Sequence, residues 1–384
     1  MIIKVLPILM TLCPMCAFAE SSVDSENRPF DIFNLPSINH IVLTQGAGYF
    51  PVLNEYEGEL YAVYRIHAGH IGRSGALEIR SSTAAATLWN PPQLVVDSPA
   101  DDRNPAVGIT RTGRIVVGYW ELDSYTPDGK YQPELNQSRS MVTWSDDLGK
   151  TWSEPIPINV PELETQSPYG KIIQLPDGTL LMNLYGAYAK DIPGMEKVRD
   201  DYPHYAYLIR SSDNGETWGE PSLILEEHNE TALLSIDGKR LLAVSRSSGQ
   251  QRLDLVRSED SGRTWSAPMR LTGPNQHPAD LLQLSNGWII LLYGDRSQEN
   301  KVIRGMMSRD QGLTWDNRHE LMFSRPVQGD FGYPSGVLLP DGRIAIMYYW
   351  AGMAEHSQDG GDARSYINMF NEEEFIQALN QYSN

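Results

Sequence analysis

The chain has 384 residues, and its 49 acidic side chains outnumber its 31 basic ones, which gives a formal net charge of −18. Nucleic acids and anionic membrane surfaces attract proteins through lysine and arginine, so a charge of this sign argues against both as partners. The composition includes 32 glycines, 25 prolines and 19 tyrosines. Together with the scarcity of helical periodicity, this composition favours a β-rich fold.

Residues 1–19 have the pattern of a secretory signal peptide, in which a basic residue and an apolar run precede the small-residue motif Ala17-Phe18-Ala19. The apolar run is too short to remain as a membrane span, so no membrane insertion is expected. Cleavage after Ala19 predicts an exported protein, either periplasmic or secreted, that has lost both of its cysteines. Disulfides, thiol catalysis and cysteine-bound zinc are then excluded, and no metal or cofactor is required. A less favoured alternative makes Cys16 a lipidated N-terminus.

Beyond this segment, apolar strands flank a turn glycine in six successive places along the chain. The glycines recur every 50 to 65 residues or so, a spacing typical of repeat architectures built from small sheets. The turn glycines are Gly58, Gly113, Gly178, Gly238, Gly287 and Gly342.

A second repeat, Ser-x-Asp-x-Gly-x-Thr-Trp, alternates with the first. The pattern predicts a hairpin turn in which Asp accepts backbone hydrogen bonds, Gly adopts a positive φ and Trp packs beneath a strand. A structural role for these carboxylates is therefore favoured over a catalytic one. The full copies are Ser145–Trp152, Ser211–Trp218, Ser258–Trp265 and Ser308–Trp315, and Ser81–Trp89 is a degenerate fifth copy.

Six units, each with two strands ahead of a hairpin, predict an all-β fold of radial four-stranded sheets. We expect one six-bladed β-propeller over residues 30–384, preceded by an N-terminal extension over residues 20–29. Arg364–Phe370 is predicted to be a closing strand. Asn371–Gln381 is predicted to be a short helix with Asn371 as its N-cap.

The repeated boxes resemble those of the sialidase (neuraminidase) superfamily, where they are called Asp-boxes or bacterial neuraminidase repeats. The resemblance extends over nearly all of the chain after the signal peptide. It implies the propeller fold and an axial pocket, and it is a poor guide to activity because the boxes lie away from that pocket.

The register of the repeat predicts which side chains face the axis. The start of each innermost strand and the end of the next strand converge on one axial mouth. On this basis Arg65 and Arg246 are equivalents in the first and fourth blades, which face each other across a six-bladed ring. Two guanidinium groups that converge on one cavity suit a carboxylate or sulfate ligand. The alternative is that each arginine pairs with a nearby acidic side chain.

In the second half of the chain, the resemblance implies a set of site residues. Sialidases hold the sugar carboxylate with three arginines and attack the anomeric carbon with a tyrosine that a glutamate activates. The segment from Glu230 to Arg246 is similar to the one that carries this glutamate and the second arginine. Arg304 resembles the third arginine, and Tyr333 resembles the nucleophilic tyrosine.

The first half departs from the family. Tyr49-Phe50-Pro51 stands where the family has Arg-Ile-Pro, so the first arginine is lost, and Arg65 resembles an additional arginine of the next strand. The usual acid/base aspartate is also absent. His67 and His70 stand in its place, and histidine can act as a general acid or base near neutral pH.

Further side chains are expected at the mouth of the pocket. Asp102 is a carboxylate alternative to His70 as the proton donor, unless it only holds Arg103. Arg103, His67, His277 and Tyr185 are expected to contribute to substrate binding. For each of them, a purely structural role is the competing interpretation.

The expected function is that of an exported exo-glycoside hydrolase of the exo-α-sialidase type, which removes a terminal anionic sugar from a glycan or oligosaccharide. One alternative is a polysaccharide lyase that uses histidine and tyrosine for β-elimination on a uronate. A second alternative is a propeller that binds glycans without cleaving them. The sequence does not specify the sugar, its linkage or the oligomeric state.

Overall fold

The protein is described here from a computed structural model. The predicted signal peptide and almost all of the predicted N-terminal extension lie outside the described residues. No helix within the described part is long and apolar enough to cross a membrane. The structure describes residues 29–83, 88–132, 135, 137–161, 163–188, 203–352 and 362–382.

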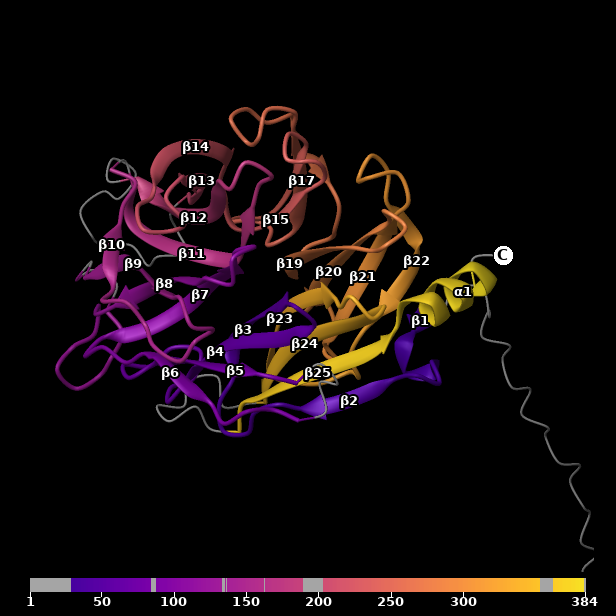
Figure 1. Ribbon diagram of the computed structural model, residues 1–384, viewed down its shortest axis with the longest axis horizontal. Helices are drawn as coiled ribbons and strands as arrows, with labels where there is room; N and C mark the ends of the chain where they lie inside the picture. Colours follow the sequence, from indigo (N-terminus) through magenta and orange to yellow (C-terminus); the bar gives the residue numbers. More distant parts are fainter. Residues whose placement is uncertain are drawn as a thin grey trace, which may run out of the picture.

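Four-stranded antiparallel units follow one another around a common centre (Figure 1). Within the first half of the chain, short connections and the boxed hairpins join the successive strands. The strands here are β3 (Tyr49–Tyr56), β4 (Glu59–Ile66), β5 (Ala76–Ser81) and β6 (Gln93–Val96); β7 (Asp101–Ile109), β8 (Ile115–Leu122), β9 (Ser138–Ser145) and β10 (Ile156–Ile158); and β11 (Leu163–Gln174), β12 (Leu180–Tyr188), β13 (Tyr205–Ser211) and β14 (Gly219–Glu226).

The second half continues the same order, and its last unit takes one strand from the N-terminal part of the chain. The strands are β15 (His228–Ser235), β16 (Leu241–Ser247), β17 (Leu253–Ser258) and β18 (Met269–Arg270); β19 (Gln276–Gln283), β20 (Ile289–Asp295), β21 (Val302–Ser308) and β22 (Asp316–Met322), extended by β1 (Phe30–Asp31); and β23 (Asp330–Leu338), β24 (Arg343–Gly352) and β25 (Arg364–Asn371), completed by β2 (Asn39–Val42).

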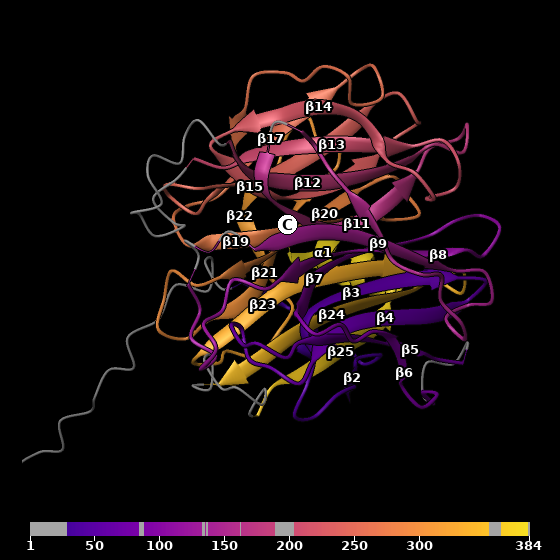
Figure 2. The ribbon, with the colours of Figure 1, turned by 90° about the vertical axis from the view of Figure 1, so that its left-hand side faces the viewer.

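The first strand of each unit lies innermost, and these strands contact one another in a closed ring. β3 contacts β7, β7 contacts β11, β11 contacts β15, β15 contacts β19, β19 contacts β23, and β23 contacts β3. Figure 2 shows β3, β7 and β11 side by side. The β7 and β11 strands also form a short parallel pairing, so that two four-stranded units join into one eight-stranded sheet. The all-β, propeller-like fold is confirmed, and the count of six blades stays a prediction.

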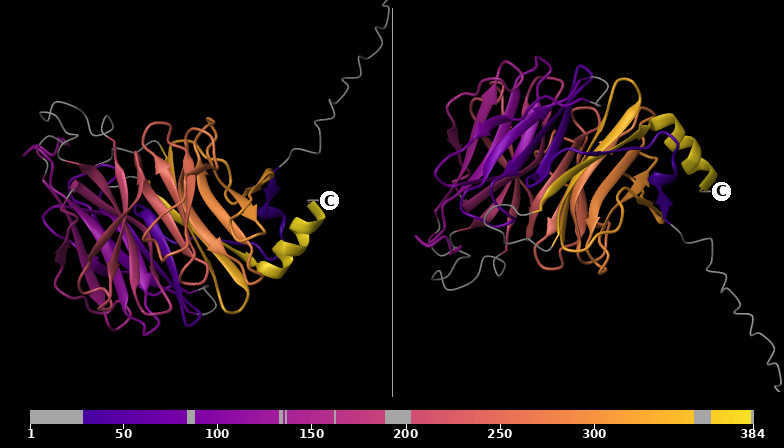
Figure 3. Two further views of the ribbon diagram at one scale, coloured as in Figure 1. Left: turned by 90° about the horizontal axis from the view of Figure 1, so that it is seen from above. Right: turned by 90° about the horizontal axis from the view of Figure 1, so that it is seen from below.

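The ring is closed by strands from the two ends of the described chain. β2 pairs antiparallel with β25, from Asn39 opposite Met369 to Val42 opposite Tyr366. The predicted closing strand and terminal helix are both present, the helix as α1 (Glu372–Tyr382). The Asn371 side chain accepts a hydrogen bond from the backbone N–H of Glu374 at 3.0 Å, as an N-cap does. Figure 3 shows α1 at the edge of the molecule beside β1.

The Asp-boxes form the turns between the third and fourth strands of their units, away from the ring of inner strands. In the first full copy, Asp147 accepts hydrogen bonds from the backbone N–H of Thr151 at 2.8 Å and from its hydroxyl at 2.7 Å. Gly149 has a φ of +89°, and Trp152 packs against the core. The hydrogen bonds from Thr151 lower the pKa of Asp147 to about 2. The predicted structural role of these carboxylates is confirmed.

Candidate active site

Each inner strand contains a shift in register of the kind that a β-bulge produces, and residues at these shifts include side chains that meet at the axis. The antiparallel register shifts between Tyr49 and Val52, Arg103 and Ala106, Tyr169 and Ile173, His228 and Thr231, Gln276 and Ala279, and Gly332 and Ser335. Bulges turn side chains out of the ordinary strand alternation. Several bulge residues adopt a positive φ, including Phe50 at 51°, Asn104 at 50° and Tyr333 at 52°.

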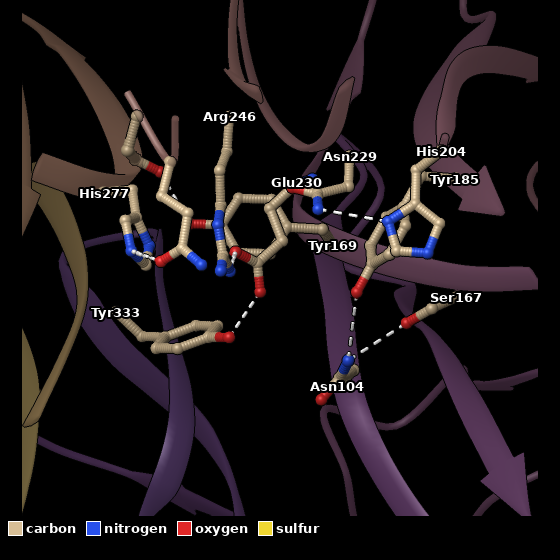
Figure 4. A network of polar contacts seen from close by, with 12 residues as sticks. Asn104, Ser167, Tyr169, Tyr185, His204, Asn229, Glu230, Arg246, His277 and Tyr333 are labelled. Atoms are coloured by element: carbon tan, nitrogen blue, oxygen red, sulfur yellow. Dashed lines mark hydrogen bonds and ion pairs between the residues drawn. The ribbon is translucent and has the colours of Figure 1, made fainter. Parts of the chain in front are cut away.

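The centre of the site is formed by Tyr333 of β23, Glu230 of β15 and Arg246 of β16 (Figure 4). The hydroxyl of Tyr333 donates a hydrogen bond to one carboxylate oxygen of Glu230. The other carboxylate oxygen accepts a hydrogen bond from Nη1 of Arg246 at 2.7 Å. Glu230 and Tyr333 are buried, with exposed fractions of 3% and 9%. The predicted tyrosine, glutamate and second arginine therefore come together.

The charges in this centre favour an ionised carboxylate beside a neutral phenol. Burial alone raises the pKa of Glu230, but Arg246, the Tyr333 hydroxyl and Arg296 together bring that pKa below its ordinary value. Burial and the charge of Glu230 raise the pKa of Tyr333 well above its ordinary value, against the opposing effect of Arg246. Glu230 is thus placed to accept the phenolic proton of Tyr333.

Arg296 is a second guanidinium group in the site, and it was not among the predicted site residues. Its Nη1 donates to the backbone carbonyl of His277 and lies 3.1 Å from Nδ1 of that imidazole, and its Nη2 donates to the carbonyl of Phe331. Burial, followed by the charges of Arg246 and Arg296, lowers the pKa of His277 well below its ordinary value. His277 is therefore in its neutral form, close to the positive charges of Arg246 and Arg296.

Arg246 keeps donors that the protein does not use. Within the described part of the chain, its Nε is buried and has no hydrogen-bond partner. The Arg246 side chain is 21% exposed, so part of its guanidinium is accessible to an acceptor from outside the chain. Because the charges of Arg246 and Arg296 both lower the pKa of Glu230, positive charge gathers near this carboxylate, and the natural acceptor is an anion.

Polar and aromatic side chains form the other side of the centre. The side chain of Asn104 donates to the Ser167 hydroxyl at 3.0 Å and to the Tyr185 hydroxyl at 3.4 Å. The Tyr169 ring lies 6.0 Å from the Tyr333 ring, and its hydroxyl donates to the Ala279 carbonyl at 2.7 Å. Tyr185 is therefore located where it was predicted (Figure 4).

The axis is closed on the inner side of Tyr333. The ammonium group of Lys171 pairs with Asp280 at 2.6 Å, and the same carboxylate accepts the backbone N–H of Gly336 at 2.7 Å. A cavity of about 20 Å³ remains beside Tyr333, and this volume accommodates roughly one water molecule. Little free space therefore remains between the inner strands beside Tyr333.

His70 lies at the rim next to the centre. Its Nδ1 is 3.0 Å from Oδ2 of Asp330, and the Tyr349 hydroxyl donates to the same carboxylate at 2.9 Å. The Phe50 ring contacts both the His70 ring, at 5.0 Å between centroids, and the Tyr333 ring, at 4.9 Å. His70 therefore belongs to the same cluster of rings as the central tyrosine.

The prediction that Arg65 binds substrate is wrong. Arg65 is fully buried, and its guanidinium donates to Asp101 at 3.0 Å through Nε and to the carbonyls of Ala68, Gly69 and Gly72. A guanidinium group has five N–H donors, and the protein already engages all three nitrogens of this one. The alternative that the arginine pairs with a neighbouring acid is the correct one.

Arg304 and Asp102 also point elsewhere. Arg304 donates to Asp295 at 2.7 Å and to Glu320 at 2.8 Å, so the predicted third arginine is an ion-pair residue of its own unit. Asp102 accepts hydrogen bonds from the backbone and hydroxyl of Ser98 at 2.6 and 2.9 Å. Asp102 is also fully buried, so its carboxyl group cannot reach a substrate, and the prediction that it donates the proton is wrong.

The last three predicted residues, His67, Arg103 and His277, differ in their location relative to the site. His67 is exposed and lies near Glu78, outside the centre of the site. Arg103 is buried behind the site, 5.2 Å from the Phe50 ring and 5.6 Å from the Trp120 ring. Its positive charge lies near Tyr333, but its guanidinium packs against these two aromatic rings. His277 is in the site as predicted.

One site residue, Asp330, was not found from the sequence. Arg296 directly follows β20, and the rule of strand ends predicts that it faces the axial mouth, although no role was assigned to it. Asp330 begins β23 three positions before Tyr333, and nothing in its local sequence distinguishes it. Within the described residues, no group of three His, Cys, Asp or Glu side chains could hold a metal ion.

The fold and the centre together define an all-β, propeller-like protein with a tyrosine, a carboxylate and arginines at its axis. The family described as BNR repeat-like domain matches residues 58–346. The chain therefore belongs to the BNR repeat-like family of the sialidase superfamily.

Known proteins with similar sequences or structures agree with this placement. A sialidase of Paraclostridium sordellii is 28% identical over 155 residues, a match that covers 37% of this chain and 36% of that protein. A structure of a protein of unknown function from Dyadobacter fermentans has a TM-score of 0.70 at 18% identity, covering 88% of this chain and all of that one. An intramolecular trans-sialidase from Ruminococcus gnavus, solved with oseltamivir carboxylate, has a TM-score of 0.63 at 15% identity, covering 88% and 97%.

Proposed function

We propose that the protein is a sialidase-like exo-glycoside hydrolase that removes a terminal anionic sugar, sialic acid or a related acidic sugar, from glycans. The observation that carries this proposal is the line of hydrogen bonds from Tyr333 through Glu230 to Arg246. A buried tyrosine that donates to an ionised carboxylate is a nucleophile with its base already in place.

The chemistry follows from the protonation states. Glu230 accepts the phenolic proton as the Tyr333 oxygen attacks the anomeric carbon, and a covalent glycosyl-tyrosine results. A neutral phenol approaches an anionic sugar with less repulsion than a carboxylate nucleophile experiences. Arg246 stabilises the carboxylate form of Glu230 at rest.

The anionic group of the sugar is assigned to Arg246 and Arg296. The unused donors of Arg246 and the nearby guanidinium of Arg296 provide positive charge where the predicted trio of Arg65, Arg246 and Arg304 does not form.

The test is release of the fluorophore from 4-methylumbelliferyl α-sialoside. We expect turnover by the wild type, a loss of at least about 10³-fold in Tyr333→Phe and a loss of about 10²–10⁴-fold in Glu230→Gln. Tyr366→Phe, on β25 at the outer side of its unit, is the matched control and should leave turnover unchanged.

Other outcomes select other functions. No release from any sialoside rejects sialic acid as the substrate. An unsaturated product formed from a uronate polysaccharide indicates a lyase. Glycan binding without turnover, unaffected by Glu230→Gln, indicates a binding protein.

We also infer two features that extend this proposal. Six blades are supported by the ring of six contacting inner strands, because the eight-stranded sheet contains two four-stranded units. Export is supported only by the sequence of residues 1–19. An intact mass that begins at Glu20 in protein recovered outside the cytoplasm tests it, and an uncleaved N-terminus in cytoplasmic protein contradicts it.

A further inference from the structure

His70 is held by groups from two other inner or neighbouring strands. Its ring packs at right angles to Phe50 of β3, and its Nδ1 lies 3.0 Å from Asp330 of β23. Tyr349 of β24 also donates to Asp330, so both carboxylate oxygens are engaged. His70 keeps about a quarter of its side chain exposed, whereas Asp330 is buried.

The loop that carries His70 is fixed from below by Arg65. The buried guanidinium donates to three backbone carbonyls of the loop, those of Ala68, Gly69 and Gly72, and pairs with Asp101 of the next unit. The hydroxyl of Tyr125 donates to Asp101 at 2.9 Å. A loop anchored at three carbonyls holds its histidine in one place, as precise proton transfer requires.

The hydrogen bond to Asp330 also selects the form of the imidazole. Burial raises the pKa of Asp330, but His70, Arg296 and the Tyr349 hydroxyl bring it below its ordinary value, so this carboxylate is ionised. An ionised carboxylate accepts from Nδ1–H, which leaves Nε2 as the nitrogen that gains or gives a proton. Among the described residues, Nε2 has no hydrogen-bond partner.

We propose that His70 is the acid/base residue of this site and that Asp330 and Arg65 are its positioning residues. This inference rests on the proposed function, and it goes further by assigning the proton transfer to an imidazole where related enzymes are expected to use a carboxylate. The titratable and charged groups that face His70 are Asp330, Tyr349 and Tyr49, with Arg296 acting through Asp330.

The proposed hydrolysis has two steps. In the first, the Tyr333 oxygen bonds to the anomeric carbon, its proton passes to Glu230, the glycosidic C–O bond breaks, and Nε2–H of His70 protonates the leaving oxygen. In the second, neutral His70 takes a proton from the water that attacks the anomeric carbon. The bond to Tyr333 then breaks, and its oxygen recovers the proton from Glu230.

The test compares two substrates that differ in how much the leaving group needs a proton. With 3′-sialyllactose, a poor leaving group, His70→Ala should lower kcat/KM by about 10²–10⁴-fold. With 4-methylumbelliferyl α-sialoside, a good leaving group, the loss should stay below about tenfold. His67→Ala, on the same loop but exposed, is the control and should change neither value.

The positioning role has its own readout. Asp330→Asn should reproduce the difference between substrates in milder form and move the alkaline limb of the pH profile to lower pH, because the imidazolium loses its charged partner. His70→Gln, which fills the same space, guards against collapse of the loop and should behave as His70→Ala does. Equal losses on both substrates, or no loss on 3′-sialyllactose, would overturn the proposal.

An independent measurement separates this proposal from the proposed function. If the wild type cleaves neither substrate, the sialidase assignment fails while the arrangement of His70 is still tested by ¹⁵N NMR of its imidazole. We expect a protonated Nδ1 throughout and a titrating Nε2, with this preference lost in Asp330→Asn. A neutral imidazole protonated at Nε2 would overturn the proposal regardless of activity.

Discussion

Two arginines with the same position in the repeat have opposite roles in this protein. Arg246, near the end of β16 and beside Glu230, has a buried Nε without a partner among the described residues. The guanidinium of Arg65, in contrast, donates hydrogen bonds to Asp101 and to three backbone carbonyls. The difference arises because Asp101, from the next unit, supplies a buried anion to Arg65. An arginine that completes the protein contributes to stability, and one that leaves donors free contributes to binding.

This contrast predicts the effect of removing Arg65. Arg65→Ala leaves Asp101 buried with only Tyr125 and the more distant Arg103, so unfolding in urea should show a loss of about 3–5 kcal/mol. Arg263→Ala, which breaks an exposed ion pair with Glu220, should cost about 1 kcal/mol at most. Equal costs for the two variants would contradict the assignment of Arg65 as a structural residue.

Asp102 gives a prediction about pH. Burial, with smaller contributions from Glu121 and Asp101, raises its pKa from 3.8 to about 7 despite hydrogen bonds from Ser98. The folded protein then holds this proton more tightly than the unfolded chain, so Asp102 makes stability fall as the pH rises from about 4 to about 7.

Asp102→Asn removes this titration while keeping the shape of the side chain. Scanning calorimetry gives the Tm of the variant minus the Tm of the wild type. This difference should be a few degrees more positive at pH 8 than at pH 5. Asp123→Asn, at an exposed position nearby, serves as the control and should show no such dependence. A pH-independent difference for Asp102→Asn would argue against a raised carboxyl pKa.

Which residues of the site could be predicted depends on what the repeat encodes. The register places Glu230, Arg246, Tyr333, Tyr185 and His277 correctly, because it fixes which positions begin or end an inner strand. It does not encode which partner a side chain finds on a neighbouring unit. For this reason the roles of Arg65 and Asp102 were misjudged, and Asp330 was not found.

At the scale of elements, the bulges of the inner strands create the site. Gly332 precedes Tyr333 with a φ of +135°, a conformation that favours glycine, and the next residue turns its ring toward Glu230. A Cβ at Gly332 would lie 2.5 Å from Nη2 of Arg296. The bulge thus places Tyr333 close to the guanidinium of Arg296.

Gly332→Ala should therefore impair activity more than stability. We expect kcat/KM for the aryl sialoside to fall by about 10²-fold, because Arg296 must move, with a stability cost of roughly 1–3 kcal/mol. Gly342→Ala is the matched control, since it has a φ of +82° with no atom within 4 Å of the added Cβ. It should lose comparable stability and keep its activity, and a similar loss of activity in both variants would refute the argument.

The elements themselves were predicted more fully than the bulges. Alternating strands, turn glycines and Asp-boxes are local patterns, so the order of the strands and the terminal helix followed from the sequence. A bulge depends on how one strand pairs with the next, and a residue such as Phe50 does not signal a positive φ by its type.

For the whole molecule, closure of the ring by β2 is the feature that most affects stability. A chain that starts at residue 29 keeps β2, whereas one that starts at residue 43 also loses buried Phe30, Ile32 and Leu35. Each buried apolar side chain contributes about 1.5–3 kcal/mol. The shorter chain should therefore melt roughly 10 °C or more below the longer one, and equal Tm values would show that β2 does not close the ring.

The ring also brings together residues that synthesis separates. His70 and Asp330 are 260 positions apart, and Glu230 and Tyr333 are 103 apart. Contacts at such separations form late and slowly in folding, because a long loop must close before they gain anything. A nascent chain that still lacks β23 has the base of the nucleophile but neither Tyr333 nor Asp330. A partly made protein would thus lack the complete set of site residues until β23 has been synthesised and has packed into the ring.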